Sequence, residues 1–103
     1  MMEEVEKWRV AASEWLDLQE AADILRETKN DVLAEITSRQ PGNSHAEKDR
    51  NARISDEWKT FRTNMLEAEA KARRSKLRVK YADMCFDAKR SENANARAER
   101  SKY

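Results

Sequence analysis

A single proline and a single glycine stand next to each other, at positions 41 and 42 of this 103-residue chain. Proline cannot continue a helix and glycine accepts left-handed backbone geometry, so Pro41–Gly42 predicts a turn. Neither residue type occurs anywhere else in the sequence. A β-sheet protein of this length would need many more turn residues. The pair therefore predicts an all-α chain folded once, into two long helices.

The segment before this turn carries apolar residues at intervals of three and four. This spacing, in which only Lys29 is out of place, keeps one side of a helix facing a partner helix. The apolar residues are Trp8, Ala11, Trp15, Leu18, Ala22, Leu25, Val32 and Ile36. We therefore expect a helix over about residues 2–39, followed by a turn over residues 40–44.

The segment after the turn shows the same periodicity. Ser44 followed by Glu47 predicts a capping box, and a helix is expected from residue 45 to about residue 100. Its seam is formed by Ile54, Trp58, Phe61, Met65, Ala68, Ala72, Ser75, Val79, Ala82 and Phe86. A break near Asn64 or Ser75 is the alternative, although neither site has turn residues. We expect an unbroken helix, in a single domain spanning residues 1–103.

A short turn makes the two helices antiparallel, in a coiled-coil-like hairpin. Residues 1–38 contain ten acids against four bases. Folding the chain about residues 41–43 lays the acids of residues 3–20 beside the basic run, residues 71–80. In this register the start of the first helix lies opposite about residue 83, so residues 84–103 are expected to overhang. The same register places Trp15 near Ala68 and Ala72, Trp8 near Ala72 and Ser75, and Phe61 near Ala21 and Ala22.

A second apolar stripe, here called the outer stripe, lies on the second helix about 180° from its seam at ~100° per residue. It comprises Leu66, Ala70, Leu77, Tyr81, Met84 and Ala88. The first helix cannot cover both sides of the second. Because exposed apolar surface favours association, we expect a helical bundle formed by a homo-oligomer, with a dimer favoured, and docking of a protein partner.

The basic C-terminal third offers an alternative function. Lysine and arginine neutralise phosphates, and residues 71–103 contain eleven of them against four acids. The candidate nucleic-acid contacts are Arg74, Arg78, Lys89, Arg90, Arg97 and Arg100. Acids of the first helix facing the basic run are the competing explanation for part of this charge. A DNA- or RNA-associated accessory protein is therefore the alternative to a helical assembly module.

The sequence lacks the patterns that carry catalysis, cofactor binding or metal binding. His45 is the only histidine and Cys85 the only cysteine, and neither a Gly-rich phosphate loop nor zinc-ligand spacing occurs. The acidic start, residues 1–6, does not resemble a signal peptide, and no apolar run is long enough to span a membrane. We expect a non-enzymatic, cytoplasmic protein without cofactor, metal, membrane or small-molecule substrate.

The segment AKRSENANARAER, residues 88–100, follows a Lys/Arg-rich helix. It resembles the ends of small α-helical accessory proteins encoded by tailed phages and prophages. The resemblance covers the last third of the chain and lies in its Ala, Asn and Arg content. It implies an early-region protein that acts on host or phage DNA-processing machinery, and it assigns no functional residues.

Overall fold

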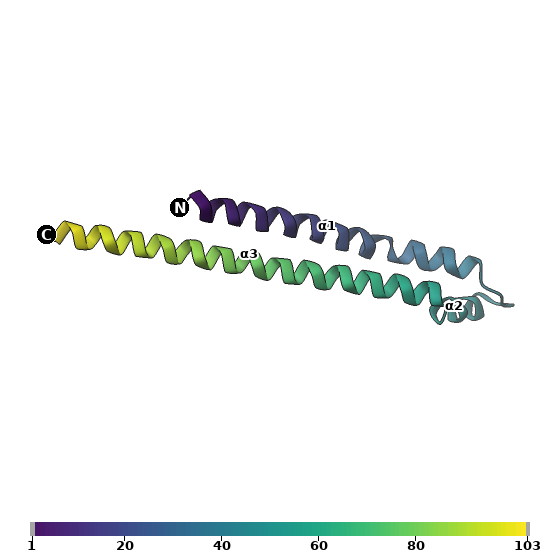
Figure 1. Cartoon of the computed structure of the whole chain (residues 1–103). Coiled ribbons are helices and arrows are strands. Elements are labelled where there is room, and N and C mark those ends of the chain that lie inside the picture. Colours follow the sequence, from purple (N-terminus) through teal and green to yellow (C-terminus); the bar gives the residue numbers. More distant parts are fainter. Residues whose placement is uncertain (1, 103) are drawn as a thin grey trace.

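The computed structural model describes residues 2–102 of the chain, with side chains described over residues 3–98. Helix α1 covers Met2–Ser38, α2 covers His45–Arg53 and α3 covers Asp56–Lys102. Figure 1 shows α1 and α3 running side by side in opposite directions, with α2 at the end where the chain turns back. The predicted all-α helical hairpin is confirmed.

The turn is built around Gly42, whose φ of +151° disfavours any residue with a side chain. A Cβ at this position would come within 3.2 Å of the Cγ atoms of both Glu47 and Lys48. Ser44 then caps α2, because its Oγ accepts a 3.2 Å hydrogen bond from the Glu47 amide. The Glu47 carboxylate accepts a 3.0 Å hydrogen bond from the amide of Asn43. The two predicted capping residues thus start α2.

The helix expected to run unbroken from residue 45 to about residue 100 is divided at Ile54 and Ser55, which corrects that prediction. Ser55 explains the break. Its Oγ donates a 2.6 Å hydrogen bond to the carbonyl of Ala52 in α2 and accepts a 3.2 Å hydrogen bond from the amide of Trp58 in α3. One side chain therefore both closes α2 and caps α3.

Helix α3 is continuous over 47 residues. It passes without a break through Asn64 and Ser75, the two sites considered for an interruption. Ile54, which was assigned to the seam, is 64% exposed because it lies in the break between α2 and α3.

The core lies where the three helices meet. Each helix contributes one almost fully buried side chain: Ile36, Ala52 and Trp58. Three partly buried residues pack against them: Val32, Leu33 and Phe61. The rings of Trp58 and Phe61 stack with their centroids 5.6 Å apart. Farther from the turn, the buried residues of the α1–α3 seam are Ala22, Met65, Ala72 and Ser75.

The register of α1 against α3 differs from the predicted one. Two ion pairs define it: Arg39 lies 2.8 Å from Glu57, and Arg26 lies 3.2 Å from Glu69. The cause is α2, which packs at the turn and takes up nine residues that were expected to pair directly with α1. Helix α3 is therefore displaced along α1 by roughly the length of α2.

The aromatic residues follow this displaced register. Trp15 lies against Lys76, with 5.7 Å between Nζ and the ring centroid. Phe61 packs on the core cluster at the turn instead of contacting residues 21 and 22. The predicted contact of Phe61 was wrong because it assumed that the second helix pairs with α1 from its first residue.

The overhang of α3 is shorter than predicted. Val5 and Trp8 of α1 line one pocket together with Asp83 and Phe86 of α3, so α1 still covers α3 at residue 86. The expected overhang at residue 84 and the expected packing of Trp8 on residues 72 and 75 are both corrected by this contact. Trp8 remains 41% exposed, at the rim of the seam. Figure 1 shows α3 continuing past the start of α1.

Candidate interaction surface

The outer stripe of α3 is exposed. Its large side chains Leu77, Tyr81 and Met84 retain 65%, 70% and 69% of their accessible surface, and Leu66 retains 51%. Ala88 is exposed as well, and Ala70 is half-buried. At ~100° per residue, all six residues of the outer stripe fall within about 60° of one another on α3. They form a narrow apolar surface, about 33 Å long at 1.5 Å per residue, on the side of α3 opposite the seam.

Tyr81 is the one ionisable residue of the outer stripe, and its phenol is protonated at neutral pH. The thiol of Cys85, one turn further along α3, raises the pKa of the Tyr81 phenol. Hydrogen bonding is the larger cause and charge repulsion the smaller one. A raised pKa leaves the phenol protonated well above neutral pH, because its ordinary value is already near 10. Cys85 itself is exposed beside the stripe.

The basic run borders the outer stripe at Leu77. All of its lysines and arginines are exposed, and it contains no acid: Lys71, Arg73, Arg74, Lys76, Arg78 and Lys80. Across the described side chains, the ion pairs that join α3 to α1 or to the turn after it are Arg26–Glu69 and Arg39–Glu57, and neither involves the basic run. The acids of α1 therefore do not hold these bases in direct ion pairs.

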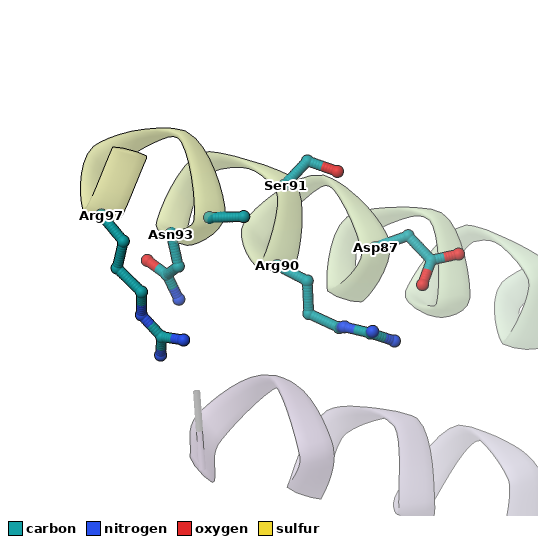
Figure 2. A pocket seen from close by; sticks show the side chains of 6 residues that line it. Asp87, Arg90, Ser91, Asn93 and Arg97 are labelled. Atoms are coloured by element: carbon teal, nitrogen blue, oxygen red, sulfur yellow. The ribbon is translucent and has the colours of Figure 1, made fainter. Parts of the chain in front are cut away.

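The candidate nucleic-acid contacts do not form a single surface. Arg74, Arg78 and Lys89 share one side of α3, within about 60° at ~100° per residue. Arg90 and Arg97 line an open pocket near the first turn of α1, together with Asp87, Ser91, Asn93 and Ala94. Figure 2 shows the side chains of Arg90 and Arg97 projecting from α3 on the side where α1 begins. The side chain of Arg100 lies outside the described residues.

Helix α1 carries exposed apolar residues that its sequence pattern did not single out. Val10 and Ile24 are 50% and 53% exposed. With Ala21, also exposed, they fall within about 60° on α1, roughly a quarter turn away from its seam at ~100° per residue. Acids surround them: Glu6, Glu14, Asp17 and Glu20. They lie off the heptad repeat, so the apolar spacing that marks the seam does not include them.

Metal-binding groups and membrane-spanning helices are both absent from the described residues. Within that part of the chain, no group of three His, Cys, Asp or Glu side chains is placed to hold a metal ion. His45, at the start of α2, is exposed. None of the described helices combines the length and the apolar character needed to cross a membrane.

Comparison with known proteins found no matching family model, no matching curated protein and no matching solved structure.

Proposed function

We propose that this protein is a non-enzymatic helical assembly module of the cytoplasm, which associates with itself and with a protein partner through the outer stripe of α3. The observation that carries the proposal is the exposure of Leu77, Tyr81 and Met84 along one side of a continuous helix. Apolar side chains repeated in this way form a surface that releases ordered water when another helix covers it.

The small size of the core supports this proposal. The cluster of buried residues at the turn contains three residues, Ile36, Ala52 and Trp58. Beyond it, the seam is narrow and its buried positions are mostly small, such as Ala22 and Ala72. Because a hairpin of two helices buries a small fraction of its surface, association through a further apolar face adds needed stability.

Light scattering across a range of protein concentrations tests the proposal. The wild-type mass should rise above the single-chain value of 12.1 kDa. Leu77→Glu should lower the mass to the single-chain value, because a carboxylate in the middle of the stripe would have to be desolvated on association. Leu16→Glu, at an exposed apolar residue of α1, is the matched control and should associate like wild type. A wild-type chain that remains a monomer at every concentration would refute the proposal.

A second candidate function is favoured by one observation: within the described part of the chain, no ion pair joins the basic run to the acids of α1. Exposed lysines and arginines without ion-pair partners are available to phosphates. The resemblance of residues 88–100 to phage-encoded accessory proteins points in the same direction. Titration with duplex DNA at two salt concentrations tests this candidate: binding should weaken steeply with salt, and no binding at low salt would eliminate it.

A further inference from the structure

We infer that the outer stripe of α3 is covered by an acidic face of α1 from a second copy of the chain. This inference rests on the proposed function and adds the identity of the occupant. The acidic face is defined by Val10, Ala21 and Ile24 with the acids around them, Glu6, Glu14, Asp17 and Glu20. It is exposed on α1 and combines apolar side chains with a charge opposite to that of the basic run.

Charge argues against the symmetric alternative, in which two α3 helices meet through their outer stripes. The basic run borders Leu77, near the middle of the stripe, and contains six bases and no acid. A two-fold axis near Leu77 would bring the basic runs of two copies together. Like charges placed against each other across an interface oppose association. The stripe therefore favours an acidic occupant over a second α3.

The acidic face of α1 supplies such an occupant. Glu14, Asp17 and Glu20 are exposed, and among the described side chains they form no ion pair or hydrogen bond with α3 of the same chain. Their charges are therefore available to a basic surface on another copy. Beside them, a shallow depression is lined by Glu3, Glu6, Lys7, Val10, Ala11 and Glu14. A large apolar side chain such as Tyr81 or Met84 of the second copy fits the chemistry of this depression.

The two surfaces also match in length. Val10 and Ile24 are about 21 Å apart along α1, and Leu66 and Tyr81 are about 22 Å apart along α3, at 1.5 Å per residue. In an antiparallel arrangement, Ile24 can therefore lie against Leu66 while Val10 lies against Tyr81. Asp17 then falls beside the basic run at residues 73 and 74. The same alignment therefore brings the apolar side chains into contact and places the acid beside the bases.

This contact joins two different surfaces, so it is heterologous. Each copy keeps an unused outer stripe or an unused acidic face after the first contact forms. Association through such a contact continues beyond two chains unless the assembly closes into a ring. A symmetric contact between two outer stripes would stop at the dimer. The two modes of association therefore differ in a way that variants with one damaged surface can reveal.

The experiment uses two full-length double variants, one for each surface. Val10→Lys with Ile24→Lys damages the acidic face, and Leu77→Lys with Tyr81→Lys damages the outer stripe. Each variant alone should remain at the single-chain mass of 12.1 kDa in light scattering. An equimolar mixture should form a complex of two chains and no larger species, because one intact surface of each kind remains. The two damaged surfaces both carry lysines, which prevents them from pairing with each other.

Circular dichroism of each variant checks that its helices are retained, and Leu16→Lys serves as a control on another side of α1. If the acidic-face variant associates like wild type while the stripe variant stays monomeric, the inference is overturned and the proposed function stands. A mixture that contains single chains alone also overturns the inference. If the wild-type chain never associates, the proposed function is refuted as well.

Discussion

The ammonium group of Lys76 on α3 lies over the indole ring of Trp15 on α1, with 5.7 Å between Nζ and the ring centroid. A cation at this distance is attracted by the negative face of the ring. The indole Nε1 of Trp15 is buried and has no hydrogen-bond partner. The ring is therefore held by packing and by the cation above it. This contact joins the two long helices far from the core at the turn.

Replacement of Lys76 by methionine tests this contact, because the apolar stem is retained and the charge is removed. Lys76→Met should lower the free energy of unfolding by about 0.5–1 kcal/mol, the usual strength of a cation–π pair. Urea unfolding followed by circular dichroism measures the change. Lys71→Met, at an exposed position of the same basic run, is the control and should change stability by less than about 0.5 kcal/mol. Equal effects of both substitutions would contradict a specific role for Lys76.

Trp58 should dominate the stability of the hairpin. Its side chain is 3% exposed and packs with Ile36 and Ala52 where the three helices meet. Trp58→Ala should cost about 3–5 kcal/mol, because it removes the largest side chain of this cluster and leaves a cavity. Trp8→Ala should cost less, because Trp8 is at the rim of the seam. Urea unfolding of both variants provides the comparison, and a larger loss for Trp8→Ala would contradict the placement of the core.

Ser75 within α3 and Ser55 at its N-cap should respond differently to replacement by alanine. Ser75 is buried and its Oγ has no hydrogen-bond partner, so Ser75→Ala should leave stability unchanged or raise it. Ser55 caps α3 through the Trp58 amide, so Ser55→Ala should cost about 1 kcal/mol. Thermal unfolding of the two variants measures both effects. A destabilised Ser75→Ala would indicate that its hydroxyl has a partner after all.

Much of the fold follows from local signals in the sequence. Pro41 and Gly42 predict the turn, and Ser44 with Glu47 predicts the start of α2, because these signals act within a few residues. The heptad spacing also identifies residues such as Ile36 and Trp58, which are buried in the structure. These features depend on the geometry of a single helix or turn.

The break at Ser55 was not predicted, and the predicted register was wrong. A local signal for the break exists: Ser55 precedes Asp56 and Glu57, and a serine followed by acids is typical of a helix start. It was missed because the apolar spacing continues across it. The register depends on how α2 packs at the turn, and a repeating seam allows several alignments that differ by whole turns. The exposed Val10 and Ile24 were missed for a related reason, because they lie off the repeat.

The most direct test of the central claim, that the outer stripe is a docking surface, is the oxidation rate of Met84 measured by mass spectrometry over a range of protein concentrations. Met84 is 69% exposed in the single chain, and Met65 is 7% exposed and provides an internal reference. At low concentration Met84 should be oxidised much faster than Met65. As the mass in solution rises, the rate for Met84 should fall several-fold toward that of Met65. A rate for Met84 that stays constant while the chain associates would contradict the claim.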